Sequence, residues 1–490
     1  MGRPETILVT GATGYIGGRL VPRLIESGRR VRVLVRSRSR AQGRSWYPRV
    51  DVAVGDVLDS ETPAPALAGI DTAYYLIHSM SSGTDFHERD IQAARAFGTA
   101  AKEAGVKRII YLGGLGDPAS KLSHHLRSRQ STGQALRESG VPVTEFRAAV
   151  IVGAGSISFE MIRYLVERLP VMICPRWIYS RIQPIAIDDL LDYLVAALDA
   201  PESQGRVIEI GGADVVTYRG MMLGYARARG LRRLLLPVPV LTPRLSAYWV
   251  HWITPIHAGI SSALIEGLHN DVVVTNDLAR SLFPHVAPGD YASAIDRLID
   301  DLNAGRIDTS WSDALGAPAP REQPVRLEAR HGMIIERRRE RVSSPARDVY
   351  RVFTGIGGRR GWFFATWAWR LRGGLDRLLG GVGLRRGRRH PDDLRIGDAL
   401  DFWRVEDLHL DRSVRLRAEM KLPGRAWLQF DVRQAQDGTS HLEQTAAFIP
   451  TGLPGLAYWY GLYPLHRWIF GGLVKAIARR AERMATTDDG

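Results

Sequence analysis

The chain has 490 residues, of which 45% are hydrophobic and 24% are charged, a composition typical of folded globular domains. This length predicts about two to three domains rather than a single core. The 66 basic and 52 acidic residues leave a net charge of +14, but the arginines are scattered and no nucleic-acid motif accompanies them. We therefore expect no nucleic-acid partner. The single cysteine, Cys174, excludes an intramolecular disulfide and a cysteine-rich metal site, and we interpret it as a small buried residue.

The N-terminal residues do not resemble a secretory signal. Met1 leads directly into an apolar strand at 6–10, without the charged start, apolar stretch and cleavage site of a signal peptide. Two apolar stretches, 234–268 and 452–474, are interrupted by prolines and basic residues, so neither is expected to span a membrane. Both contain Trp and Tyr, which suit membrane interfaces. We expect a cytoplasmic protein, with peripheral contact to the inner face of the membrane left open.

The first 150 residues alternate short apolar runs with segments of helical periodicity. Helices are predicted at 17–27, 90–104 and 126–139. The apolar runs are 7–9, 31–35, 52–54, 73–77, 109–112 and 144–152, with a further strand at 207–210. Apolar strands that alternate with helices indicate a parallel sheet covered on both faces. The predicted fold class is therefore α/β, a doubly wound parallel-sheet Rossmann domain.

A glycine-rich segment, Gly11-Ala-Thr-Gly-Tyr-Ile-Gly17, joins the first strand to the first helix. Gly11 permits a tight turn, Gly14 lets the backbone approach a pyrophosphate, and Gly17 allows close packing of helix on sheet. The helix N-terminus offers N–H groups and a positive dipole end to phosphates. This context favours a dinucleotide site over a plain glycine-rich turn. The residues that we assign to the site are Gly11, Thr13, Gly14, Tyr15, Ile16 and Gly17.

The end of the second strand predicts which dinucleotide binds. It reads Val35-Arg36-Ser37-Arg38, whereas an NAD-selective site usually has an acidic residue here for the ribose hydroxyls. The guanidinium of Arg36 suits a 2′-phosphate instead. The alternative is that Arg36 is one surface arginine among many. We predict NADP(H) as the cofactor, with NAD(H) as the weaker candidate.

The spacing Gly-x-x-Gly-x-x-Gly resembles the extended and atypical short-chain dehydrogenase/reductase superfamily. Further matches over roughly residues 4–300 are Gly55-Asp56, Tyr75-Leu-Ile-His-Ser79, 106–114 and 181–189. The last of these resembles the family segment that opens a late helix beside the substrate cleft. The resemblance implies that Asp56 and Val57 contact the adenine and that His78 and Ser79 lie along the cofactor.

The usual catalytic residues of this superfamily are missing. Classical members have Ser or Thr after the fifth strand and Tyr-x-x-x-Lys on the next helix, where this chain has Gly113-Gly114-Leu115 and His124-His-Leu-Arg-Ser-Arg129. His125 and Arg129 are four residues apart and therefore share a helix face. A histidine can transfer protons near neutral pH, and an arginine can hold ribose or phosphate. We take this pair as the catalytic candidates, with an exposed polar helix start as the alternative. No zinc-ligand spacing occurs, so no metal is expected.

The pattern changes after the segment 315–324, which is rich in Pro and Ala. We predict a first domain at 1–315, a linker at 316–326 and a second domain at 327–490. Apolar residues alternate at 414–420 and 426–432, and Asp437-Gly438 predicts a hairpin turn into a strand at 440–449. A long helix is predicted from about 454 to 484. This order resembles the START-like (SRPBCC-type) helix-grip fold, an α+β fold in which an antiparallel sheet wraps a long C-terminal helix.

Helix-grip folds often enclose an apolar cavity, so the resemblance implies a lipid-like ligand. The residues that would line the cavity, or simply form a core, are Trp362, Phe363, Phe364, Trp367, Trp369, Trp403, Trp427, Trp459 and Trp468. The fusion of the two domains resembles a bacterial group of NAD(P)-binding proteins. Two basic runs, 337–339 and 385–389, suit lipid head groups, but we favour a solvated surface for both.

Three functions are consistent with these features. We favour an NADP(H)-dependent oxidoreductase that acts on an apolar small molecule, because the glycine turn accompanies a Trp-rich second domain. A non-catalytic NADP(H) sensor or binding protein is the alternative, since the Ser and Tyr-x-x-x-Lys residues are missing. A sugar-nucleotide epimerase-like enzyme is the third choice, because that chemistry also depends on the missing pair.

Overall fold

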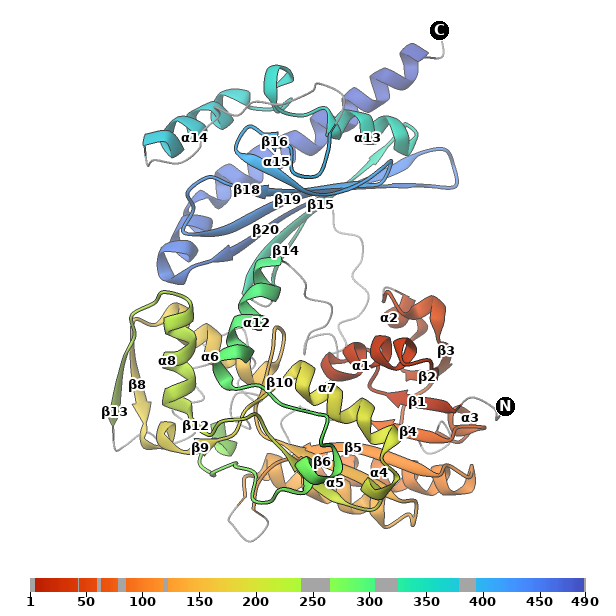
Figure 1. The fold of residues 1–490 in the computed structure, drawn as a ribbon. Coiled ribbons are helices and arrows are strands. Elements are labelled where there is room, and N and C mark those ends of the chain that lie inside the picture. The colour runs from red at the N-terminus through yellow and green to blue at the C-terminus, as the bar shows by residue number, and fades with distance from the viewer. Residues whose placement is uncertain are drawn as a thin grey trace. The chain divides into compact units, whose positions relative to one another are not determined.

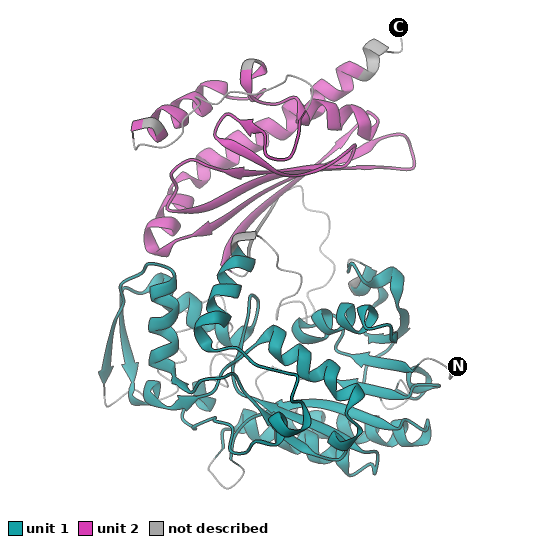
Figure 2. Cartoon of the chain, in the orientation of Figure 1, with its two compact units in different colours: residues 1–316 teal, residues 317–490 magenta. Residues whose placement is uncertain are grey.

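A computed structural model describes residues 5–42, 44–59, 63–77, 85–117, 122–238, 265–304, 325–330, 332–378 and 394–488. The chain divides into two compact units, residues 1–316 and 317–490, which are shown separately coloured in Figure 2. Most of the predicted linker, and the residues His78 and Ser79, lie outside the described residues.

The first unit contains a seven-stranded sheet in which every neighbouring pair is parallel (Figure 1). The strand order is β11-β6-β5-β4-β1-β2-β3. Its strands are β1 (Thr6–Thr10), β2 (Arg30–Val35), β3 (Asp51–Val54), β4 (Thr72–Tyr75), β5 (Arg108–Gly114), β6 (Val143–Ala148) and β11 (Val207–Ile210). The predicted parallel sheet is therefore confirmed.

Helices cover both faces of this sheet. On one face α1 (Tyr15–Glu26) and α7 (Ile187–Ala196) form a core with Val9 and Tyr74. On the other face α4 (Asp85–Glu103) and α5 (His124–Arg137) form a core with Leu8 and Tyr75. Successive strand residues point to opposite faces, so a strand buried on both sides must be apolar throughout. The short helices α2 (Arg38–Gln42) and α3 (Pro63–Leu67) complete the layers.

One predicted strand is wrong in its extent. The apolar run 144–152 divides into β6, which lies in the main sheet, and β7 (Ile151–Val152), which pairs with β10 (Ile185–Ala186). Both pieces contribute buried or half-buried side chains. The apolar run therefore continues from a strand of one sheet into a strand of another, and the sequence pattern does not show where the first strand ends.

Shorter elements follow the sheet and form the remainder of the first unit. They are α6 (Ile157–Arg168), β8 (Val171–Pro175), β9 (Arg181–Ile182), β12 (Val216–Thr217), α8 (Tyr218–Ala228), β13 (Leu234–Val238), α11 (Leu278–Leu282) and α12 (Tyr291–Ala304). Strand β8 pairs with β13, and α8 packs against both α6 and α12. A 3-10 turn, Arg176–Tyr179, follows β8.

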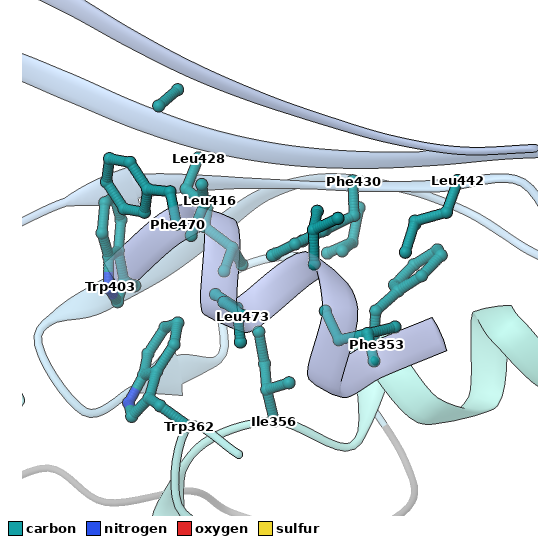
Figure 3. Close-up of a cluster of buried hydrophobic side chains, with 14 of the residues drawn as sticks. Phe353, Ile356, Trp362, Trp403, Leu416, Leu428, Phe430, Leu442, Phe470 and Leu473 are labelled. Carbon is teal, nitrogen blue, oxygen red and sulfur yellow. The ribbon is translucent and has the colours of Figure 1, made fainter. Parts of the chain in front are cut away.

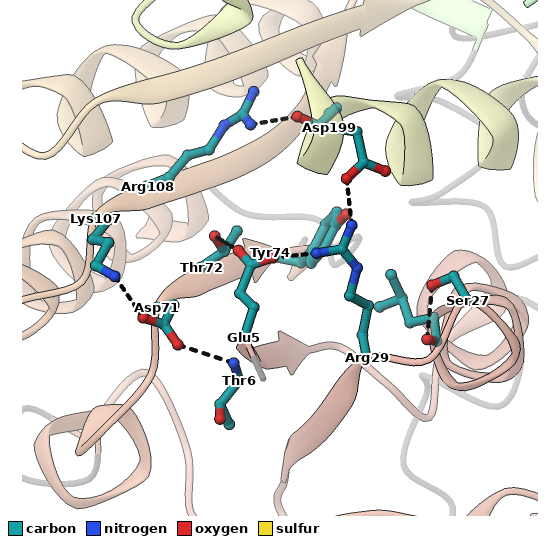
Figure 4. A network of polar contacts seen from close by, with 12 residues as sticks. Glu5, Thr6, Ser27, Arg29, Asp71, Thr72, Tyr74, Lys107, Arg108 and Asp199 are labelled. Carbon is teal, nitrogen blue, oxygen red and sulfur yellow. Dashed lines mark hydrogen bonds and ion pairs between the residues drawn. The ribbon is translucent and has the colours of Figure 1, made fainter. Parts of the chain in front are cut away.

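A polar network fixes the amino ends of the central strands (Figure 4). Glu5 accepts hydrogen bonds from Arg29 at 2.7 Å and from the Thr72 hydroxyl at 2.7 Å. Asp71 accepts from the Thr6 N–H at 3.0 Å and from Lys107 at 2.8 Å. These residues start β1, β2, β4 and β5, so the opposite, carboxyl ends of the same strands are held in a fixed arrangement.

The second unit contains a seven-stranded antiparallel sheet of order β14-β15-β20-β19-β18-β17-β16. Its strands are β14 (Val325–Arg330), β15 (Met333–Val342), β16 (Ala399–Leu400), β17 (Trp403–His409), β18 (Ser413–Ala418), β19 (Gly424–Gln434) and β20 (Ser440–Pro450). The predicted turn at Gly438 has a φ of 81°, which favours glycine. The predicted antiparallel meander is confirmed.

A core forms between this sheet and the helices α13 (Ala346–Thr354), α14 (Thr366–Leu378) and α15 (Gly452–Asp488). Figure 3 shows Leu473 of α15 and Phe353 of α13 among the strand residues Leu416 and Phe430. Helix α15 starts two residues before the predicted boundary and ends four residues after it. Among the described residues no helix is long and apolar enough to cross a membrane.

Two expectations for the second unit are wrong. Trp362 and Trp369 stack in the core with ring centroids 4.5 Å apart, but Trp367 and Trp468 are exposed and line no interior. In the basic run 337–339, Arg338 is buried against Glu336 instead of solvated. Residue 338 lies on the inward face of β15, where its charge requires an ionic partner.

Candidate dinucleotide and substrate site

A cavity of about 570 Å³ lies at the carboxyl ends of the central strands of the first unit. It is lined by residues that follow β1, β2, β3, β4, β5 and β6, together with residues of α5, α6 and α8. Strand β1 has β2 on one side and β4 on the other, so successive crossovers leave it in opposite directions. In open α/β sheets ligands bind at such a switch point.

The glycine turn forms one wall of this cavity through its backbone. Gly11 has a φ of 67°, and a Cβ on it would lie 2.6 Å from the Leu76 carbonyl oxygen. A Cβ on Gly17 would overlap the carbonyl oxygen of Gly11, whose oxygen also accepts the Gly14 N–H at 2.9 Å. Side chains are thus excluded where α1 begins. The turn and the N-terminus of this helix fit a dinucleotide pyrophosphate.

Tyr15 closes the turn on its inner side. Its hydroxyl oxygen is buried, and a Cβ on Gly153 would lie 2.5 Å from it. The Arg19 guanidinium lies 4.9 Å from the ring centroid, and Arg44 donates to the Thr13 carbonyl at 2.9 Å. Burial raises the pKa of Tyr15, so its phenol stays protonated. Tyr15 therefore shapes the turn as a neutral phenol.

The residues predicted to hold the adenosine end also line the cavity. Arg36 is exposed at the end of β2, and Asp56 and Val57 follow β3. The Gly55 N–H donates to the Val35 carbonyl at 2.9 Å, which holds these two strand ends together. Asp56 accepts the Leu58 N–H at 3.2 Å.

The two catalytic candidates line the same cavity from the first turns of α5. Arg129 donates to the Leu112 carbonyl at 2.6 Å, so its guanidinium lies beside the end of β5. Burial, with a further contribution from the Arg129 charge, lowers the pKa of His125 to about 4. His125 is therefore neutral at physiological pH. A neutral imidazole can donate or accept a hydrogen bond. The lowered pKa moves the protonation of His125 below the neutral range that the sequence suggests.

Glycines stand at the end of β5, where classical members have a serine or threonine. A Cβ on Gly114 would lie 2.8 Å from a methyl carbon of Leu126, and a Cβ on Gly113 would lie 3.3 Å from the Tyr111 ring. A serine at Gly114 would therefore require the Leu126 side chain to shift. As the chain stands, these two positions offer no hydroxyl to the cavity.

The far half of the cavity is apolar and was not predicted from the sequence. Its walls come from α6, β8, the turn after β8, α8 and residues 265–272, and they include Met161, Leu165, Met172, Ile178, Met222 and Val272. These segments are far apart along the chain. No local motif connects them, and periodicity alone does not separate cavity walls from core.

Polar side chains also lie in this apolar half, among them Tyr218 and Cys174. Tyr218, the first residue of α8, is almost fully buried, and its ring meets that of Trp177 edge-on at 6.4 Å. Within the described part of the chain its hydroxyl has no hydrogen-bond partner, and burial alone raises its pKa. Cys174 is also buried, as expected, and burial raises the pKa of its thiol to about 11. Both groups are therefore protonated at neutral pH.

Among the described residues, no three or more His, Cys, Asp or Glu side chains lie together in a group that could hold a metal ion.

Comparison with known families identifies the first unit. Residues 11–155 match the family model described as NAD(P)H-binding, and residues 331–473 match the model described as "Protein of unknown function (DUF2867)". Each match covers less than half of the chain. The first unit is therefore an NAD(P)H-binding Rossmann domain, and the predicted cofactor class is confirmed.

Two curated relatives resemble the first unit. A 3-beta-hydroxysteroid dehydrogenase of Mycolicibacterium neoaurum is 32% identical over 115 residues, which cover 21% of this chain and 31% of that protein. This chain thus spans about a third of the length of that relative. A (4-alkanoyl-5-oxo-2,5-dihydrofuran-3-yl)methyl phosphate reductase of Streptomyces griseus is 29% identical over 232 residues, which cover 46% of this chain and 74% of that protein.

Solved structures confirm the fold of this unit. The triphenylmethane reductase of Citrobacter sp. superposes with a TM-score of 0.50 at 18% identity, over 60% of this chain and 99% of that one. At this identity the likeness shows the fold alone.

Proposed function

We propose that this protein is an NADP(H)-dependent oxidoreductase that acts on an apolar small molecule. The observation that carries the proposal is a single cavity that contains both the glycine turn after β1 and the apolar walls from α6, β8 and α8. Hydride transfer requires that the substrate carbon and the cofactor occupy one water-poor space. The names of the two curated relatives, a steroid dehydrogenase and an alkanoyl-furan phosphate reductase, support this substrate class and reaction type.

The residues of the chain have distinct roles in this proposal. The turn from Gly11 to Gly17 and the N-terminus of α1 bind the pyrophosphate, and Arg36 binds the 2′-phosphate. When bound, the cofactor supplies or accepts the hydride. Arg129 orients the ligand at the end of β5, and neutral His125 offers it a hydrogen bond. Tyr218 supplies a hydroxyl in the apolar half, where a substrate oxygen needs a partner.

A non-catalytic NADP(H) sensor is the second candidate. It is favoured by Gly113 and Gly114, which stand where the usual catalytic hydroxyl is expected. An epimerase-like enzyme is less favoured, because a sugar substrate has many hydroxyls and the far half of the cavity is largely apolar.

The test is NADPH oxidation by the purified full-length chain in a panel of apolar ketones, enones and quinones. We expect turnover of at least one class, together with a loss of turnover in His125→Ala or Arg129→Ala without loss of NADPH binding. Tight NADPH binding with no oxidation across the panel would favour the sensor and contradict the enzyme.

For the second unit we propose a START-like helix-grip fold. Helix α15 packs on β15 and β20 of the antiparallel sheet, as in that fold. Native mass spectrometry of the purified chain tests the ligand implied by it: a lipid-like molecule retained by residues 317–490 is expected. An isolated second unit that folds and retains no such ligand would argue against that implication.

A further inference from the structure

Helix α14 of the second unit exposes an apolar stripe to solvent. Its exposed face carries Trp367, Leu371, Leu375 and Leu378, with exposed fractions of 61%, 59%, 49% and 85%. These positions are separated by four, four and three residues and therefore form one stripe along the helix. The only acidic residue of α14, Asp376, is fully buried and accepts the Lys421 N–H at 2.7 Å. Three leucines and a tryptophan thus face solvent where polar residues are normal.

The stripe continues onto α15. The ring of Trp468 lies 6.3 Å from that of Trp367, and both Trp468 and Leu465 are exposed. We name this surface the α14–α15 face and define it by Trp367, Leu371, Leu375, Leu378, Leu465 and Trp468. A contiguous apolar surface of this kind marks an interaction site more often than an isolated exposed leucine does.

Among the described residues, the exposed charged side chains of α14 and of residues 452–481 in α15 are all basic. Arg370 and Arg467 are exposed beside Trp367 and Trp468, and residues 452–481 of α15 contain no Asp or Glu. Residues 317–490 hold 31 basic and 20 acidic side chains, so 11 of the 14 net positive charges of the chain fall in this unit. The excess charge is therefore concentrated in the unit that carries the apolar stripe.

We propose that the α14–α15 face docks on the surface of a lipid bilayer with anionic head groups. Trp and Leu side chains on one helix face, with arginines beside them, are the composition of helices that lie in the membrane interface. The arginines then meet anionic head groups while the apolar stripe enters the acyl boundary. A second copy of the chain is a less favourable partner. In a two-fold symmetric dimer the basic face of one copy would lie against the basic face of the other.

Vesicle flotation with the full-length chain tests the proposal. We expect binding to vesicles of equal parts phosphatidylcholine and phosphatidylglycerol, weaker binding to phosphatidylcholine alone, and a loss of the difference in high salt. The double variant Leu371→Ser with Leu375→Ser should weaken binding about tenfold or more. Arg370→Gln should weaken binding to the anionic vesicles by about fivefold and leave binding to neutral vesicles unchanged.

The matched controls are Leu410→Ser and Arg433→Gln, exposed residues of the same unit that lie outside the face. Both controls should float as the wild type does, and NADPH binding by all variants shows that the first unit is intact. Absence of wild-type binding to anionic vesicles would overturn the proposal. So would equal losses in the face variants and the controls. A dimer that the leucine variant converts to monomer, without vesicle binding, would assign the face to a second copy instead.

Discussion

The two halves of the cavity in the first unit are built in different ways. The cofactor half is a backbone surface, in which Gly11 and Gly17 leave no room for side chains. The substrate half is a side-chain surface, with apolar walls from three separate stretches of the chain and a buried hydroxyl, that of Tyr218, which has no partner among the described residues. A site formed by the backbone tolerates few substitutions. A site formed by side chains can bind a different ligand after one of its lining residues is substituted. This difference predicts that mutations in the two halves will have separable effects.

The largest effect is expected for Gly17→Ala. Its new Cβ would overlap the Gly11 carbonyl oxygen, so the turn must move away from the pyrophosphate position. We expect NADPH affinity to fall about a hundredfold, the cost of a few kcal/mol of local strain. Fluorescence titration of NADPH measures it. The control is Gly220→Ala in α8, where the added Cβ meets only ordinary contacts at 3.4 Å and 3.7 Å. If Gly17→Ala bound NADPH with wild-type affinity, the turn would not be part of the cofactor site.

Arg36→Asp sharpens the comparison within the cofactor half. Loss of a charge-assisted hydrogen bond to the 2′-phosphate should weaken NADPH binding by about ten- to a hundredfold while NADH binding is spared. The neighbouring Arg38 is also exposed but does not line the cavity, so Arg38→Asp is the matched control. If both dinucleotides lose affinity equally, Arg36 acts through general charge and not through the phosphate.

Tyr218→Phe tests the substrate half alone. Removing a hydroxyl that pairs with a substrate oxygen should lower kcat/KM about tenfold, with the dissociation constant of NADPH unchanged. Steady-state kinetics on the best substrate of the panel, beside the exposed control Tyr179→Phe, give the measurement. A matching loss of NADPH affinity would show that the two halves are not separable at this residue.

The smallest effect is expected for the pH dependence of stability that His125 contributes. Its pKa is about 4 in the folded chain, against about 6.5 when unfolded, because burial disfavours the cation. Below pH 6.5 the unfolded state binds a proton that the folded state does not, so the free energy of unfolding falls as pH drops toward 4. Denaturant unfolding at pH 7 and pH 5 should show a smaller fall in His125→Gln than in the wild type. The exposed control His441→Gln should retain the wild-type fall; equal slopes in all three would contradict a buried neutral His125.

The cofactor half could be predicted from the sequence because its requirements are local. A turn that excludes side chains needs glycine at fixed positions, and Gly11, Gly14 and Gly17 are contiguous with the strand and helix that they join. Arg36 was predicted because it stands where an NAD-selective site has an acidic residue, and Asp56 and Val57 were implied by the family resemblance. Gly153, which makes room for Tyr15, was missed because it acts across the fold on a residue 138 positions away.

Other features depend on tertiary contacts that a pattern does not encode. The pKa of His125 follows from burial, and the contact of Gly114 with Leu126 follows from the position of α5. In the second unit, alternation at 426–432 predicted the strand correctly, since one face of the sheet is a core. The exposure of Trp367 was not predicted. The sequence of this aromatic segment is the same whether Trp367 points inward, as Trp369 does, or outward.

The lone cysteine gives the protein a reporter of its own. Cys174 lines the substrate half, and since it is the single thiol of the chain, a thiol-labelling reagent modifies one known position. With a pKa of about 11, the reactive thiolate is scarce at neutral pH and increases about tenfold with each unit of pH. Because Cys174 is buried at the wall of the cavity, its labelling rate reports how accessible the substrate half is to the reagent. A compound that fills the substrate half should slow the labelling of Cys174. Ligands can therefore be ranked before any turnover is detected.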